Sequence, residues 1–184
     1  MIMPRSPLPP RLLPVSDAVR AYRLVYLRVD ALLRGRGDIA ELTVPACPAW
    51  TVRQTVAHLT GVAQDVVSQN LDGIASELWT QAQIDRLGQN SIDNLLDIWG
   101  TSIDALTAQL NDGASELAAG QLVFDVLNHE HDIRGALGEP GARAGDLSYG
   151  VALGFLTTVF DLMFRQTGGA AMRLTAPSIG TVQL

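Results

Sequence analysis

The sequence has few of the features on which several common kinds of protein depend. It has one cysteine, Cys47, which excludes an internal disulfide and a metal site made only of cysteines, and which fits a reducing compartment. It has no lysine, so its 13 basic residues are all arginine, which we attribute to the codon bias of a GC-rich bacterial genome. Its longest apolar run, Val151 to Phe160, is shorter than the roughly 20 residues that span a bilayer. We therefore expect a soluble, cytoplasmic protein that makes no membrane contact.

Length and charge narrow the class further. A chain of 184 residues is long enough for one domain with a full core. The net charge of -6 argues against nucleic acid as a partner, because that binding needs a basic surface. Five prolines up to Pro14, without an apolar stretch, indicate a lead over residues 1–15 that is neither signal peptide nor helix.

Apolar spacing along the rest of the chain predicts an all-α protein. The predicted helices have apolar stripes, and several have a recognisable start or stop: Ser16 as the cap of the first, a Thr51–Gln54 capping box for the second, and Gly138 after the helix of residues 118–137. We expect the last long helix to be largely buried, because it is apolar nearly all round. Short connections make these helices an antiparallel bundle over residues 16–168, followed by a hairpin or the remnant of a C-terminal domain over 169–184. The predicted helices cover about residues 17–33, 52–66, 75–88 (short), 91–110, 118–137 and 146–166, and the hairpin pairs 172–175 with 181–184.

The helix of residues 118–137 carries the densest group of polar side chains. At about 100° per residue, Asp125, His129 and Asp132 share one face of that helix. Its remaining residues are mostly apolar, so the polar face is expected to be buried, where a carboxylate and an imidazole are costly unless they are paired or bind a metal. Glu130 and His131 point elsewhere and are expected to be solvated.

A third candidate ligand lies on the second helix. His58 borders the buried side of that helix, and a bundle can bring it to Asp125 and His129. Two imidazoles and one carboxylate leave a coordination position open for water or substrate, as in catalytic zinc sites, and they also suit non-haem iron. The alternative is that His58 is a core residue with ordinary hydrogen bonds.

Other conspicuous side chains have simpler interpretations. The pair Asp93 and Asp97 fits a solvated helix face, and Asp161 fits a core carboxylate bonded to an arginine. The three tryptophans, Trp50, Trp79 and Trp99, are interpreted as core anchors.

Three separated motifs resemble one known family. The segment 44–61, VPACPAWTVRQTVAHLTG, resembles the Pro-x-Trp-Thr-Val…Ala-His-Leu signature of the mycothiol-dependent maleylpyruvate isomerase N-terminal domain, a branch of the DinB-like four-helix bundles. Residues 129–138, HEHDIRGALG, resemble the later His-x-x-Asp…Ala-Leu-Gly element of this family, and Trp79-Thr80 with Gln83 matches its middle. The motifs occur in the family's order, over about residues 16–175.

The resemblance implies a site and an activity. It implies that His58, Asp125 and His129 bind a divalent metal, usually zinc, although the family commonly has Glu where this chain has Asp125. Asp132 would orient a ligand imidazole, or else pair with an arginine such as Arg134. Cys47 would lie in a structural loop.

The activity that the resemblance implies is a thiol-dependent isomerisation or S-transfer. Mycothiol would be the cosubstrate, and an electrophilic small molecule would be the substrate. Two alternatives stay open: a non-catalytic metal-binding or interaction module, and a metal-dependent hydrolase. Bundles of this kind often pair, so a homodimer is a further expectation.

Overall fold

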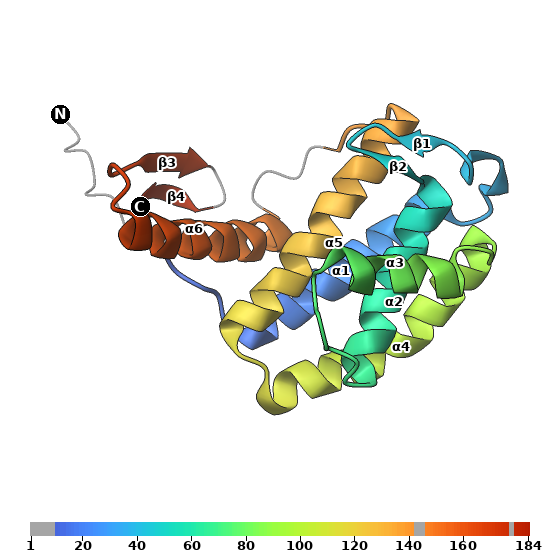
Figure 1. Cartoon of the computed structure of the whole chain (residues 1–184), viewed down its shortest axis with the longest axis horizontal. Helices are drawn as coiled ribbons and strands as arrows, with labels where there is room; N and C mark the ends of the chain where they lie inside the picture. The colour runs from blue at the N-terminus through green and yellow to red at the C-terminus, as the bar shows by residue number, and fades with distance from the viewer. Residues whose placement is uncertain (1–9, 142–145, 177–178) are drawn as a thin grey trace.

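The computed structural model describes residues 10–141, 146–176 and 179–184 and has the predicted all-α architecture (Figure 1). The prediction of a helical bundle followed by a short hairpin is confirmed, whereas most of the proline-rich lead lies outside the described residues. The helices are α1 (Val15–Leu33), α2 (Val52–Val67), α3 (Glu77–Leu87), α4 (Ile92–Gly113), α5 (Glu116–Leu137) and α6 (Leu147–Thr167), with a 3-10 turn at Gly37–Ile39.

The core lies between α1, α2, α4 and α5. Helix α2 packs on α4 and α5, and α1 packs on α4 and α5, which closes a four-helix arrangement, while α3 packs on the outside of α2. Trp99 of α4 is fully buried at the centre and donates from its indole nitrogen to the Tyr22 hydroxyl of α1, 3.1 Å away. Tyr26 meets the same indole edge-on, so the interpretation of Trp99 as a core anchor is confirmed.

Most predicted helix ends are confirmed, with one exception. Thr51 and Gln54 form the predicted capping box of α2, and Gly138 ends α5 in a left-handed conformation. The prediction that Ser16 caps α1 is wrong, because Ser16 lies inside the first turn. The carbonyl of Pro14 accepts from Asp17 and Ala18, so the helix starts immediately after this proline.

The segment between α1 and α2 is more ordered than its prolines indicated. Strands β1 (Thr43–Val44) and β2 (Cys47–Thr51) pair antiparallel there, with an irregularity between Thr43 and Val44. Strand β2 leads directly into α2 and carries Cys47 and Trp50. This short hairpin contacts α5, so it brings the start of α2 to the polar face of α5.

Helix α6 is not largely buried, contrary to the prediction. It packs on α1 and α5, but its second half extends beyond them and leaves Leu162 and Met163 about half exposed (Figure 1). As a whole α6 is long and apolar enough to cross a membrane by length and composition, a test that core helices also pass. Asp161 has the predicted arginine partner, Arg165, at 2.7 Å, but it lies on this projecting half.

The chain continues from α6 into the predicted hairpin. Strand β3 (Arg173–Ala176) pairs antiparallel with β4 (Gly180–Gln183), with Leu174 opposite Val182. Val182 is buried, whereas Arg173 and Thr175 are exposed. The hairpin thus has one covered face and one open face, as its alternating sequence predicts.

Candidate metal centre

Three potential metal ligands from two helices meet on the inner face of the bundle. The Nε2 atom of His58, on α2, lies 3.6 Å from Oδ2 of Asp125, and Nε2 of His129 lies 3.7 Å from Oδ1 of Asp125, both on α5. One ligand atom from each of the three side chains lies within 4.8 Å of the others. We call His58, Asp125 and His129 the ligand cluster.

Sequence and packing explain why these side chains converge. The spacing of four residues puts Asp125 and His129 on the same face of α5, as predicted. His58 is 5% exposed on α2, which packs against α5 at this level. Its ring centre lies 5.1 Å from that of His129, with the two rings nearly perpendicular.

Each imidazole is held by its other nitrogen. Nδ1 of His58 lies 2.7 Å from Oε1 of the buried Gln83, and Nδ1 of His129 lies 3.0 Å from Oδ2 of Asp132. Both partners are acceptor oxygens, so each Nδ1 is a protonated donor, and each Nε2 is the nitrogen that faces Asp125 and can ligate when it carries no proton. The predicted contact of Asp132 with a ligand imidazole is present, whereas no role was predicted for Gln83.

Gln83 is itself fixed on both sides. Its Nε2 donates to Oδ2 of the buried Asp65, 2.8 Å away, and the other carboxylate oxygen of Asp65 accepts from Arg86 at 3.0 Å. Gly61 makes room for it, because a Cβ at this position would lie 2.6 Å from Cβ of Gln83. A chain from Arg86 through Asp65 and Gln83 therefore sets the orientation of His58.

The geometry of the ligand cluster fits a divalent metal ion better than it fits direct hydrogen bonds. Separations of 3.6 and 3.7 Å between the Nε2 atoms and Asp125 are longer than hydrogen bonds. Ligands about 2.0–2.2 Å from a tetrahedral ion are roughly 3.3–3.6 Å apart, which is close to both of these separations. The three ligand atoms lie within 4.8 Å of one another, so they would have to draw together around an ion. Asp125 reaches both imidazoles although its side chain is one methylene shorter than that of glutamate.

Electrostatics at the cluster favour a charged Asp125. Burial by itself raises the pKa of Asp125, but the interaction with His58 and the positive charge on His129 together lower it below its usual value. Burial by itself lowers the pKa of His129, but its hydrogen bond to Asp132 and the charges of Asp125 and Asp132 raise it above its usual value. In the metal-free state these carboxylates thus favour a proton on His129, which a metal ion must displace.

An aromatic side chain, Trp50, and a sulfur-bearing one, Cys47, lie closer to the cluster than predicted. The ring centre of Trp50 lies 5.2 Å from that of His58 and 5.8 Å from that of His129, so Trp50 covers the cluster and is no core anchor. Cys47 Sγ lies 3.8 Å from Oδ2 of Asp132, and Cys47, His129 and Asp132 form a second group that could hold a metal. The hairpin β1–β2 brings Cys47 there, and this hairpin was not predicted.

The prediction that Glu130 is solvated is wrong. Glu130 is fully buried, and its carboxylate accepts from the guanidinium of Arg28, at 2.6 Å from Nη2, and from Arg134, at 3.0 Å from Nε. Its position follows from helical spacing, because Val126 and Ile133 lie on the same face of α5 and are buried. The neighbouring His131 is half-buried and lies 2.6 Å from the hydroxyl of Tyr149.

Asp93 and Asp97 are exposed, as their interpretation as a solvated pair predicts, and each also has a bonding partner. Asp97 binds Arg34 at 2.7 Å, and the Asp93 carboxylate accepts from the backbone of Gly35. They connect α4 to the end of α1, away from the ligand cluster.

The ligand cluster opens into a cavity of about 430 Å³. Its lining includes four aromatic side chains: Trp50 and Trp79, Phe124 of α5 and Phe155 of α6. The cavity is large enough for a small molecule to reach the ligand atoms, and its aromatic residues give it a largely apolar lining. Trp79 packs against the core, as predicted, and also lines this cavity.

Comparison with known families gives one match. The family model of the mycothiol maleylpyruvate isomerase N-terminal domain matches residues 26–148, about two thirds of the chain. The chain belongs to this family. Searches of curated proteins and of solved structures found no match. The family match begins within α1 and ends at the start of α6, so it is narrower than the resemblance read from the motifs.

Family membership and geometry agree on the kind of site. The family is linked by its description to mycothiol and to maleylpyruvate isomerase. Its matched region contains α2 and α5, and hence all three residues of the ligand cluster and the aspartate that holds His129. The chain is thus a member of a mycothiol-related family with side chains arranged so that they could hold a metal ion.

Proposed function

We propose that this protein is a metal-dependent enzyme that uses a small thiol, by family membership mycothiol, for isomerisation or S-transfer. The observation that supports this proposal is the arrangement of His58, Asp125 and His129, whose ligand atoms lie within 4.8 Å of one another beside an open cavity, with each Nδ1 held by an acceptor oxygen. Zinc is the metal that we expect, because two imidazoles and a carboxylate with an open position suit it.

The protein's own residues have separable tasks in this proposal. Gln83 and Asp132 keep the two imidazoles in the tautomer that presents Nε2. Trp50 covers the cluster, and with the other aromatic residues it limits water around the reacting sulfur. A bound zinc-class ion supplies Lewis acidity that lowers the pKa of a thiol in the cavity, so that the thiol is available as the nucleophilic thiolate.

A cobalt-substituted protein tests thiol binding without an activity assay. Adding mycothiol should produce an ultraviolet thiolate-to-cobalt charge-transfer band in the natural sequence. His129→Ala should lose cobalt and the band together, whereas Asn128→Ala, at an exposed neighbouring position of α5, should keep both. A cobalt-loaded protein that shows no band at millimolar mycothiol would refute thiol use at the cluster.

Two other functions use the same residues. A metal-dependent hydrolase would cleave an ester or amide without added thiol, because activated water would be the nucleophile. A non-catalytic module would bind metal through His58 but would show no turnover to lose in His58→Ala. Turnover that requires mycothiol and disappears in His58→Ala would exclude both alternatives.

A further inference from the structure

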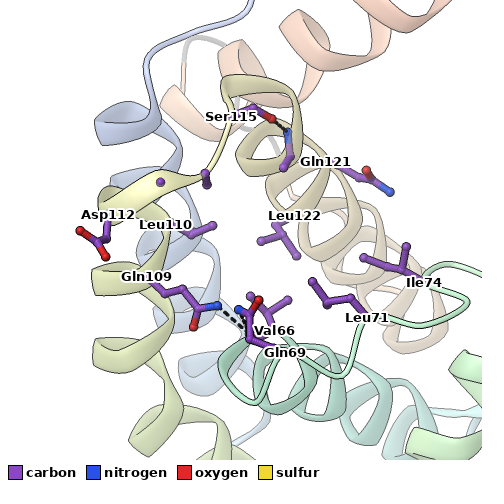
Figure 2. A pocket seen from close by; sticks show the side chains of 13 residues that line it. Val66, Gln69, Leu71, Ile74, Gln109, Leu110, Asp112, Ser115, Gln121 and Leu122 are labelled. Carbon is purple, nitrogen blue, oxygen red and sulfur yellow. Dashed lines mark hydrogen bonds between the residues drawn. The ribbon is translucent and has the colours of Figure 1, made fainter.

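A second cavity lies next to the one at the ligand cluster. It has a volume of about 510 Å³ and lies between the segment that joins α2 to α3 and the turn that joins α4 to α5 (Figure 2). The two cavities share two lining residues, Ile74 and Gln121. An elongated ligand that passes these two side chains can therefore occupy both cavities at once.

The second cavity has an apolar floor with amide groups at its edge. Leu110 and Leu122 contribute to the floor, and the amide nitrogens of Gln69 and Gln109 both donate to the carbonyl of Val66, at 3.2 and 2.9 Å (Figure 2). With their nitrogens used in this way, the side-chain oxygens of both glutamines have no protein donor among the described residues. They are acceptors that a ligand can use.

The charge of the second cavity restricts that ligand. Among the residues that the structure describes, no basic side chain lines it, and its one charged lining residue, Asp112, is exposed and directs its carboxylate away from the cavity (Figure 2). An anionic group here would find no basic side chain among the described lining residues to compensate for its desolvation. A neutral group with hydroxyl or amide N–H donors would instead pair with the glutamine oxygens and cover the leucines with its carbon skeleton.

We propose that the second cavity binds the uncharged, hydroxyl-bearing body of the thiol whose sulfur lies at the ligand cluster. This inference rests on the proposed function and deepens it, because it assigns the two ends of one ligand to two adjoining cavities. Ile74 and Gln121 lie along the part of the ligand that connects them. A dianionic electrophile would be disfavoured in the second cavity, because no basic side chain among the described lining residues offsets its desolvation.

The loop between α2 and α3 has a conformation suited to this role. Gln69 and Ala75 have φ values of 60° and 62°, in the left-handed region that residues other than glycine rarely adopt. Gln69 lines the second cavity and Ala75 lines the first. Strain of this kind persists where the surrounding structure maintains it, commonly at ligand-binding segments.

Filling the second cavity tests the proposal. Ala118 is exposed on α5 and lines this cavity, so Ala118→Phe should fill it without disturbing the core. Ala105→Phe, at an exposed position of α4 that lines neither cavity, is the matched control. Calorimetric titration of the zinc-loaded full chain compares mycothiol with N-acetylcysteine, which has the thiol end alone.

The natural sequence should bind mycothiol at least about tenfold more tightly than N-acetylcysteine, the equivalent of one or two good polar contacts. Ala118→Phe should abolish most of this preference and leave zinc content and N-acetylcysteine affinity unchanged. Gln121→Met, which keeps the length of the side chain but removes its amide, should reduce the preference by a smaller factor. Equal affinity for the two thiols in the natural sequence, or an unchanged preference in Ala118→Phe, would overturn the proposal.

A thiol-free probe separates this proposal from the proposed function. N-acetylglucosaminyl-inositol has hydroxyls and an amide but no sulfur, so it tests the second cavity without the ligand cluster. Its binding to the natural sequence, weakened in Ala118→Phe and unchanged in Ala105→Phe, would support the cavity assignment even if no thiol reached the metal. Failure of this probe to bind the natural sequence, while mycothiol binds, would refute the assignment and leave thiol use intact.

Discussion

Replacing Gln83 with methionine should weaken metal binding through a residue that does not touch the metal. Methionine has nearly the same length but makes neither of the two hydrogen bonds that Gln83 makes, to His58 Nδ1 and to Asp65. The imidazole of His58 would then be free to turn or to change tautomer. Loss of such a partner typically reduces metal affinity about 10- to 100-fold, or about 1.4–2.7 kcal/mol.

The same substitution should also destabilise the metal-free protein. Gln83 is fully buried, and its loss leaves the His58 N–H and one oxygen of Asp65 without their partner. Each unpaired buried group costs about 1–3 kcal/mol. Because Asp65 keeps Arg86 and Asn70, we expect about 2–4 kcal/mol in total.

Competition with a chelating indicator measures the metal affinity, and urea unfolding of the metal-free protein measures the stability. Gln81→Met is the matched control, because Gln81 is exposed on the same helix and bonds only to Asp85 among the described residues. It should change either quantity by less than about 0.5 kcal/mol. Metal affinity within twofold of the natural value in Gln83→Met would show that Gln83 does not orient His58.

Three further perturbations follow from the structure. Glu130→Ala leaves Arg28 and Arg134 without their buried partner and should lower the free energy of unfolding in urea by about 3–5 kcal/mol. Asn128→Ala, at an exposed position, should lower it little, and equal urea midpoints for the two variants would contradict this prediction. Metal affinity should fall as the pH is lowered through the raised pKa of His129, because the imidazolium cannot ligate. Asp132→Asn should lower the pKa of His129 and so move this loss of affinity to lower pH. Chelator titrations at several pH values measure the shift, and the same pH dependence in Asp132→Asn as in the natural sequence would contradict a role for the contact between Asp132 and His129. Burial, and to a smaller extent the charge of Asp132, raises the pKa of the Cys47 thiol. Iodoacetamide should therefore modify Cys47 at pH 8 more slowly than it modifies free cysteine, because less of the thiol is ionised. A faster reaction would contradict the placement of Cys47 beside Asp132.

The sequence predicts the parts of the site that depend on helical spacing. Asp125 and His129 are four residues apart on one helix, so their common face is a matter of local geometry. Glu130 could have been found in the same way, because it lies four residues after Val126 and three before Ile133, both apolar. Its charge instead indicated a solvent-exposed side chain. The burial of Glu130 depends on two arginines, Arg28 of a distant helix and Arg134 of its own helix, whose role no local pattern indicates.

Other features depend on tertiary contacts that no local pattern specifies. Gln83 lies on a separate helix, and only the packing of α3 on α2, allowed by Gly61, brings it to His58. Cys47 reaches Asp132 through a hairpin whose two prolines indicate a loop. The apolar composition of α6 predicts burial, but composition cannot specify whether another element covers the helix, and the second half of α6 has little cover.

The most direct test of the account is the metal content of protein purified without chelators or metal-affinity resin. Elemental analysis should find about one equivalent of zinc or a similar divalent ion in the natural sequence, and little in His58→Ala, Asp125→Ala or His129→Ala. The exposed-position variant Asn128→Ala should keep the ion. A natural protein that holds no metal even after reconstitution, or three ligand variants that keep it, would contradict the assignment of His58, Asp125 and His129 as a metal centre.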